Sequence, residues 1–403
     1  MKKQRARITA IASPEAANTL GAHLSASFQR FFDSEKASGL VLIACTLFSL
    51  LLTNTRYGAD YAAVWLFHVA GLSLSHWIND ALMAIFFLLI GLELERELYS
   101  GELSSLQNAL LPLVAALGGI ATPALIHFAL NAGTPAQAGL GIPMATDIAF
   151  ALGALALLGA RVPASLKVFV VAFAVIDDLC AILVIAVFYS TGLSFAYLGA
   201  ALAVWLLLVA MNRLLRWMSL LPYLLGGALL WFLLLKSGVH ATLAGVMLAF
   251  AIPYSARDAD QASPSHRLEE FLHTPVAFVI LPIFALANTA IPIGGNWLQE
   301  LGSSNSLGIM LGLLLGKPLG VTLVCFVAVA VGLCRLPPDL NWRHITGAGL
   351  LGGIGFTMSI FISNLAFAGA APVIDASKIA VLLASTLAGV LGFCWLRAFS
   401  VRA

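Results

Sequence analysis

Four ionisable residues lie in the middle of long apolar segments, far from either end of the segment: Asp147, Asp177, Asp178 and Lys317. In a membrane, a charged side chain at a helix centre costs roughly 2.5–3.5 kcal/mol. Four unpaired groups would therefore cost on the order of 10 kcal/mol, which is comparable to the stability of a whole protein. We expect these groups to pair with one another, to face water or to exchange protons.

The neighbours Asp177 and Asp178 should have different roles. Adjacent side chains on a helix diverge by about 100°, so the two carboxylates cannot point at one object. One of them could pair with Lys317 while the other faces a cavity shared with Asp147. The spacing leaves both assignments open, and we assign Asp177 to the lysine and Asp178 to the cavity. The alternative for Asp177 and Lys317 is a buried salt bridge that only joins two helices.

Two buried carboxylates beside a hydroxyl could bind a hard cation. Sodium prefers oxygen ligands, and Asp147, Asp178 and the neighbouring Thr146 would supply them together with free backbone carbonyls and water. Protons compete with the cation for the same crowded carboxylates. Occupancy by one ion or the other, but never both, is an exchange mechanism. We expect Asp147 and Asp178 to be the sodium ligands and expect no cofactor.

The composition indicates which elements hold these residues. Of 403 residues, 61% are hydrophobic and only 10% are charged, whereas a soluble domain is about one-quarter charged. This excludes a soluble catalytic domain and predicts an all-α membrane protein with lipid around it and no nucleic-acid partner. We expect residues 1–36 to be a basic cytoplasmic extension that could lie on the membrane surface, and residues 37–403 to be one transmembrane domain.

The apolar stretches that lie between turn-forming or charged residues are long enough to predict twelve membrane spans. They lie near residues 39–54, 77–98, 108–130, 139–158, 164–189, 194–213, 220–235, 238–254, 271–289, 306–332, 344–368 and 376–397. With this arrangement, seventeen of the 21 Lys and Arg residues fall on the side of the N-terminus, and only Arg56, Lys236 and Lys378 fall on the other. Basic residues concentrate on the cytoplasmic side, so both termini should be cytoplasmic.

The fourth and eleventh spans look interrupted. The fourth holds Pro143 and the polar pair Thr146-Asp147, and the eleventh packs five glycines into nine residues. Unwound backbone at membrane depth is tolerated where it is buried in protein or lines a cavity, and paired interruptions indicate a transporter site. Spans seven apart run in opposite directions, as an inverted repeat requires.

The longest outer connection, 57–76, predicts two short strands at 65–69 and 72–76 around Ala70-Gly71. An isolated hairpin is marginal in water, so a second copy of the chain could complete it and form a dimer through Trp65–His76. An irregular loop is an equal alternative.

A second charged cluster lies at the cytoplasmic ends of two spans. Glu93 and Glu97 share a helix face, as do Glu269 and His273. The members of the cluster are Glu93, Glu95, Arg96, Glu97, His266, Arg267, Glu269, Glu270 and His273. Histidine titrates near neutral pH, so the cluster could sense cytoplasmic pH. The alternative is a solvated set of helix ends.

The sequence resembles the NhaA family of sodium/proton antiporters over about residues 31–397. The motifs that carry the resemblance are WINDALMAIFFLLIGLELERE (77–97), ATDIAFALG (145–153), IDDL (176–179), KSGVHATLAG (236–245), GKPLG (316–320) and GIGFTMSIFI (353–362). Two positions depart from the family pattern, with Glu270 of RLEEFLH (267–273) in place of histidine and His266, directly before this stretch, in place of lysine.

The resemblance implies ion binding by Asp147 and Asp178 beside Thr146, and a coupled pair formed by Asp177 and Lys317. It also implies crossed fourth and eleventh helices, electrogenic exchange with lithium as an alternative substrate, and a dimer in the bacterial inner membrane. The pH-sensing region of the family would include Glu93, Arg96, Glu97, Glu269, Glu270 and His273.

Two other functions fit less well. An intramembrane aspartyl protease also needs two buried aspartates, but its dyad shares one proton and has no use for a lysine or for two interrupted helices. A proton-coupled symporter of an organic solute should show aromatic or arginine contacts near mid-membrane, and the sequence offers none.

Overall fold

The structure is a computed structural model that describes residues 37–190, 192–255 and 263–399. The predicted extension 1–36 lies outside the described residues. The α-helices are Ala37–Thr53, α2 (Gly58–Leu66), α3 (Leu74–Trp77), α4 (Met83–Tyr99), α5 (Leu106–Asn131), α6 (Ile148–Leu158), α7 (Ala164–Phe188), α8 (Phe195–Arg213), α9 (Leu220–Ser237), α10 (Leu243–Ala249), α11 (Pro264–Pro275), α12 (Leu281–Asn288), α13 (Trp297–Leu301), α14 (Ser304–Leu311), α15 (Lys317–Ala330), α16 (Trp342–Gly352), α17 (Phe356–Ala366) and α18 (Ala371–Phe399).

Short elements of other kinds connect these helices. Three are 3₁₀-helices, η2 (Glu102–Ser104), η3 (Pro135–Met144) and η4 (Gly159–Arg161). Three are π-helical turns, η1 (Ile78–Leu82), η6 (Val276–Ile280) and η7 (Gly312–Gly316). The π-turns join α3 to α4, α11 to α12 and α14 to α15 into continuous rods, so helical hydrogen bonding satisfies the backbone along the whole length of each rod.

Within the described ranges, nine helices are long and apolar enough to cross a membrane, or up to eleven if each of two bent pairs counts as one span. The prediction of a multi-pass all-α protein is confirmed, whereas the number twelve is not. The main difference is at 238–254, where the structure has only the seven-residue α10. Gly238 ends α9 with φ of +83°, and seven residues of helix span far less than 30 Å.

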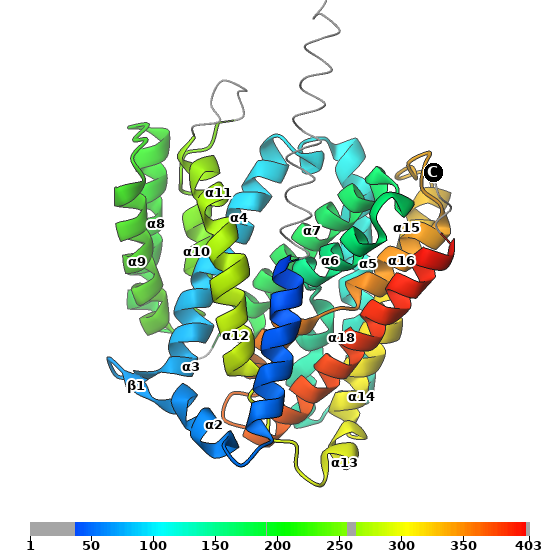
Figure 1. Ribbon diagram of the computed structural model, residues 1–403. Helices are drawn as coiled ribbons and strands as arrows, with labels where there is room; N and C mark the ends of the chain where they lie inside the picture. The colour runs from blue at the N-terminus through cyan, green and yellow to red at the C-terminus, as the bar shows by residue number, and fades with distance from the viewer. Residues whose placement is uncertain (1–36, 191, 256–262, 400–403) are drawn as a thin grey trace, which may run out of the picture.

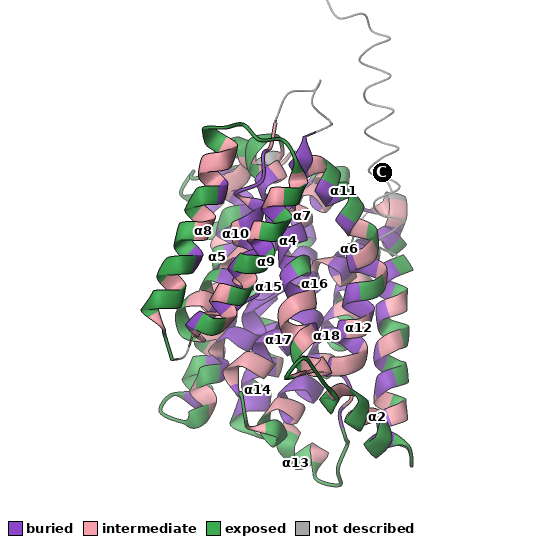
Figure 2. Ribbon diagram, turned by 90° about the vertical axis from the view of Figure 1, so that its left-hand side faces the viewer, coloured by how far each residue is buried: buried purple, intermediate pink, exposed green. Residues whose placement is uncertain are grey.

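The helices form a single mass in which α8 and α9 stand at one side, next to α4 and α10, while α15, α16 and α18 stand at the other (Figure 1). Figure 2 shows buried residues concentrated at the centre of the molecule and exposed residues along the outer face of α8. That exposed face is apolar, with Leu202, Leu206 and Leu207 among its residues, as expected for a surface that contacts lipid.

Two predicted spans are interrupted at their middles. The fourth is the 3₁₀-helix η3, then three residues without helical structure, then α6. The eleventh is α16 and α17, which are bent by 47° at Gly353–Gly355. A side chain on Gly353 would clash with the backbone carbonyl oxygen of Leu313, so this turn requires glycine.

A two-stranded antiparallel hairpin lies between α2 and α3. Strand β1 (His68–Val69) pairs with β2 (Leu72–Ser73), with His68 opposite Ser73 and Val69 opposite Leu72. The strands are shorter than those predicted at 65–69 and 72–76, because α2 continues to Leu66 and α3 begins at Leu74. Positive φ at Ala70 and Gly71 makes the turn.

Candidate functional site

The site is built where the two interrupted spans contact each other. The backbone N–H of Asp147 donates a hydrogen bond of 2.6 Å to the carbonyl of Ile354, and the Thr146 hydroxyl donates one of 2.9 Å to the carbonyl of Gly352. Each break therefore satisfies polar backbone groups that the other leaves open. Buried backbone groups need such partners, which explains how extended chain persists at this depth.

Asp147 is the N-cap of α6 and also binds the start of α17. Its Oδ1 accepts from the backbone N–H of Phe150 at 3.3 Å. Its Oδ2 accepts from the backbone N–H of Thr357 at 3.1 Å and from the Thr357 hydroxyl at 2.6 Å. Helix N-termini favour negative charge, so the two half-helices α6 and α17 both support an ionised carboxylate here.

Asp177 pairs with Lys317. The lysine Nζ donates to both carboxylate oxygens, at 2.9 and 2.8 Å, and to the Thr146 hydroxyl at 2.9 Å. Both side chains of the ion pair are fully buried, and the Phe173 ring centroid lies 5.5 Å from Nζ. A buried ion pair is tolerated when hydrogen bonds satisfy both partners, and Thr146 provides that third contact.

Asp178 faces a different region. It lies on α7 directly after Asp177, is 1% exposed, and its Oδ1 has no hydrogen-bond partner in the described structure. Asp178 lines a cavity of about 50 Å³ together with Thr146, Asp147 and Thr357. That is enough room for a few water molecules or a small cation. A buried oxygen without a partner beside such a cavity is an unused ligand.

The same cavity extends to the second charged cluster, because Glu93 of α4 and His273 of α11 also line it. His273 Nε2 lies 3.5 Å from Glu93 Oε1 and 3.9 Å from Glu269 Oε1. The shortest contact of the cluster is 2.8 Å, between Arg96 Nη1 and Glu269 Oε1. The structure thus brings α4 and α11 together through their charged residues.

Other members of this cluster differ in their contacts. Glu97 Oε1 lies 3.3 Å from Arg96, and His266 Nδ1 lies 3.8 Å from Glu269. Glu95, which is 4% exposed, accepts a hydrogen bond of 3.0 Å from the Ser265 hydroxyl. Glu270 is exposed and makes no ion pair within the described ranges, so the structure does not bring it into the network.

Several residues that build this site are not apparent from the sequence. Thr357, which holds Asp147, stands in the glycine-rich motif GFTMS but was not singled out. Ser385 of α18 accepts hydrogen bonds of 3.1 Å from the backbone N–H groups of Gly355 and Phe356, and nothing in its local sequence marks it. The π-turns η6 and η7, which directly follow Pro275 and precede Lys317-Pro318, were also missed. Such turns are frequent at functional sites.

The cavity is therefore lined by the carboxylates of Asp147 and Asp178 and the hydroxyls of Thr146 and Thr357, with Glu93 also in its lining, and the Asp177–Lys317 ion pair contacts Thr146. Oxygen ligands of this kind suit a hard monovalent cation. The same oxygens take up protons, so the arrangement can exchange one cation for the other.

The chain resembles known antiporters over most of its length. The sequence model of the family described as Na+/H+ antiporter 1 matches residues 29–396. The chain is 67% identical to the Na(+)/H(+) antiporter NhaA of Dechloromonas aromatica (strain RCB), over 93% of this chain and 97% of that protein. It is 55% identical to the Na(+)/H(+) antiporter NhaA 1 of Flavobacterium johnsoniae, over 93% and 97%, and 51% identical to NhaA 2 of Pseudomonas syringae pv. syringae, over 93% and 95%. The chain is therefore a multi-pass membrane protein that belongs to the NhaA family of Na+/H+ antiporters.

Proposed function

We propose that this protein exchanges sodium ions for protons across a bacterial inner membrane at Asp147 and Asp178. The observation that carries the proposal is the cavity that both carboxylates line, where one oxygen of Asp178 has no partner. Sodium would bind between the two carboxylates with the Thr357 hydroxyl and water completing its ligands. Protons would replace it on the same oxygens.

The Asp177–Lys317 pair couples the site to the protein around it. Thr146 lies between the two functions, because its hydroxyl accepts from Lys317 and donates to the break at Gly352. A change in charge at the neighbouring Asp178 would act on Lys317 through a medium of low dielectric constant. If Lys317 releases a proton when sodium binds, the exchange moves more protons than sodium ions and is electrogenic. Lithium, a smaller hard cation, would use the same oxygen ligands.

Access to the site would alternate between the two faces by movement of one group of helices against the other. A chain of hydrogen bonds between α17, α12 and η1, at the end of α4 opposite to Arg96, supports this movement. There Asn364 of α17 donates 2.7 Å to Asn288 of α12, and Asn288 donates 2.9 Å to Asn79 of η1. Asn79 donates 3.4 Å to Ser75. This chain of side-chain amides fastens the interrupted helix to α12 and η1, and it would open when the site faces outward.

Regulation by cytoplasmic pH would use the charged cluster on α4 and α11. Glu93 and His273 line the cavity that holds Asp178, so protonation of the histidine changes the charge along the path to the site. Arg96, Glu97 and Glu269 would set the pH at which this happens through their ion pairs. Glu270, exposed and outside these pairs, would contribute less.

A dimer through the hairpin remains part of the proposal. The residues of β1 are exposed, and Trp77 holds the hairpin by donating 2.9 Å to the carbonyl of Val69. A two-stranded sheet leaves unpaired edges, which the same hairpin of a second copy could cover. The hairpin would lie on the outer face of the membrane, and both termini would be cytoplasmic.

The test is exchange by the purified protein in liposomes. Sodium added outside vesicles with an acidic interior should collapse the pH gradient, and Asp147→Asn and Asp178→Asn should abolish this collapse. The matched control is Asp339→Asn, which changes an exposed aspartate far from the site and should leave exchange intact. Full exchange by both site variants, or cleavage of a peptide substrate without exchange, would overturn the proposal.

A further inference from the structure

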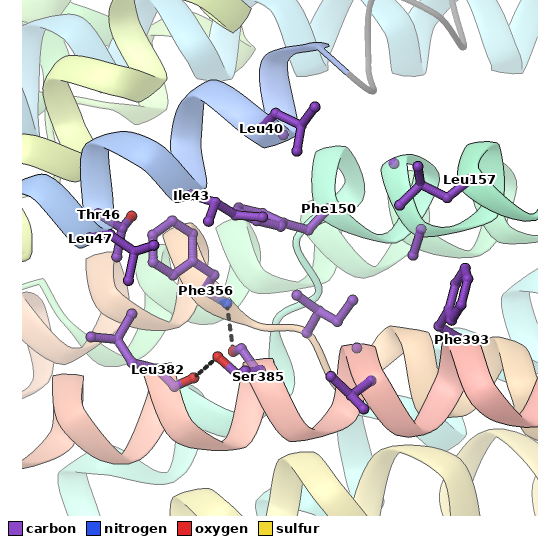
Figure 3. A pocket seen from close by; sticks show the side chains of 17 residues that line it. Leu40, Ile43, Thr46, Leu47, Phe150, Leu157, Phe356, Leu382, Ser385 and Phe393 are labelled. Atoms are coloured by element: carbon purple, nitrogen blue, oxygen red, sulfur yellow. Dashed lines mark hydrogen bonds between the residues drawn. The ribbon is translucent and has the colours of Figure 1, made fainter.

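A second and larger cavity lies apart from the carboxylates, in a crevice between helix Ala37–Thr53, α6 and α18. Its volume is about 550 Å³, within the range of about 300–1,000 Å³ that is usual for ligand pockets. In Figure 3 the three helices surround it, with Leu157 and Phe393 at one end and Thr46 and Leu382 at the other. None of these residues takes part in the proposed exchange.

The lining of this crevice suits an apolar chain. Apart from three hydroxyls, its side chains are apolar. Thr46 and Thr386 each donate to the carbonyl four residues earlier in their own helices, at 2.8 Å in both cases. Ser385 is occupied by the N–H groups of Gly355 and Phe356. A polar ligand would lose its hydrogen bonds to water and gain few in return, whereas a hydrocarbon chain loses none.

The end of the crevice at Leu157 and Phe393 carries positive charge. Arg397 follows Phe393 by four residues on α18, so it lies on the same helix face one turn further. Arg161 lies beyond Leu157 in the chain, at the end of η4 and after Gly159 has ended α6, and α6 packs against α18. Neither arginine makes an ion pair or a side-chain hydrogen bond with any residue in the described ranges. Two unpaired guanidinium groups at this point favour a phosphate group.

The geometry points to a binding site for one anionic phospholipid, with an acyl chain in the crevice and its headgroup phosphate on Arg161 and Arg397. Anionic lipids are enriched on the cytoplasmic side, which is where the charge distribution of the chain places both arginines.

The bound chain would touch the elements that hold Asp147. Phe150 and Phe356 both line the crevice and pack edge to face with centroids 5.0 Å apart. The backbone of Phe150 donates to Asp147, and Thr357 follows Phe356. The lipid is therefore placed to support the contact between the two breaks. Its binding does not depend on the exchange reaction, so it can be tested even if the proposed function fails.

Two pairs of variants separate the two halves of the site. Gly39 lines the crevice, and a Cβ added there would meet nothing within 4 Å, so Gly39→Trp should fill it. Gly199 of α8 offers the same open space on the exposed lipid face, which makes Gly199→Trp its control. Arg161→Gln with Arg397→Gln removes the charges, and Arg267→Gln removes an exposed cation elsewhere.

The measurement is native mass spectrometry of the full-length protein titrated with dioleoyl phosphatidylglycerol or dioleoyl phosphatidylcholine. We expect the unmodified protein to bind its first phosphatidylglycerol at least fivefold more tightly than phosphatidylcholine. Gly39→Trp should weaken this first binding at least fivefold, and the double arginine variant should remove the preference between the two lipids. Both controls should match the unmodified protein. Equal affinity for the two lipids, or unchanged binding by Gly39→Trp, would overturn the proposal. Either result is also what we expect if a second copy or another segment of the chain fills the crevice in place of lipid.

Discussion

The backbone N–H of Asp147 donates a hydrogen bond of 2.6 Å to the carbonyl of Ile354, so the two interrupted spans are joined at the position of the carboxylate. The backbone and the side chain of Asp147 thus have different functions. Its backbone closes the contact between the breaks, and its side chain binds the start of α17 through Thr357. A cation that competes for this side chain would act directly on the contact between the two halves of the protein.

Thr357→Val tests this contact by removing one hydroxyl with little change in shape. The hydroxyl donates 2.6 Å to Asp147, and a hydrogen bond to a charged group contributes about 1.5–3 kcal/mol. We expect the sodium concentration for half-maximal exchange to change by about tenfold in liposomes. The control is Thr322→Val, because the Thr322 hydroxyl donates to Thr346 of α16 at 3.3 Å, outside the cavity that Asp147 lines, and this variant should give the unmodified value. An unchanged sodium dependence in Thr357→Val would remove Thr357 from the site.

Lys317→Ala should destabilise the protein, because it leaves Asp177 buried without a partner. Breaking a buried ion pair costs about 3–5 kcal/mol, whereas replacing both partners costs less. We expect a large fall in the melting temperature of the detergent-solubilised protein. Adding Asp177→Asn should recover part of it, and Lys317→Arg should retain some exchange. A melting temperature equal to that of the unmodified protein would count against the pairing.

Glu269→Gln should change the pH dependence of exchange. Glu269 lies 2.8 Å from Arg96 and 3.9 Å from His273. Removing this anion electrostatically disfavours the protonated form of His273, so if loss of that proton switches exchange on, activation should begin at a lower pH. The comparison is Glu270→Gln, the next residue, which is exposed and should leave the profile of rate against pH in place. Identical profiles for all three proteins would refute a sensing role for this cluster.

The chain of amides between α17, α12 and η1 should be energetically coupled. Asn288 bonds to both Asn364 and Asn79, so Asn288→Ala and Asn364→Ala should not be additive in their effects on stability. We expect a coupling of about 1 kcal/mol in a double-mutant cycle followed by chemical denaturation. Asn212, which bonds only to the carbonyl of Ala251, provides the control cycle with Asn364 and should be additive. Additivity in both cycles would argue against a fastening role.

Sequence patterns could predict those residues that are energetically unfavourable in an apolar helix whatever their tertiary contacts. Asp147 and Lys317 are conspicuous because each is the one charged residue of a long apolar segment, and Pro143 near Thr146-Asp147 and the five glycines of 346–359 mark the two spans that are interrupted. The adjacent carboxylates of the IDDL motif diverge, so they predict that only one of them pairs with Lys317, but the spacing alone leaves open which one.

The features that sequence could not give depend on contacts between distant segments. Thr357 is an ordinary residue until the eleventh span meets the fourth, and Ser385 acquires its role only because α18 packs beside the break. The segment 238–254 is apolar enough for a span, yet it contains only the seven-residue α10, in which Gly245 packs tightly on the backbone of α4 at Ala84. Each π-turn shifts the helix register by one residue. The hydrophobic pattern of the sequence is too imprecise to reveal a shift of one residue.

The central claim is that Asp147 and Asp178 hold either sodium or protons, and its most direct test is proton release from the purified protein in detergent. Sodium added to a weakly buffered sample should release protons in a saturable way, and potassium at the same ionic strength should not. Asp178→Asn and Asp147→Asn should each lose this release. Sodium binding detected by calorimetry without any proton release, or release that persists in both variants, would contradict the account.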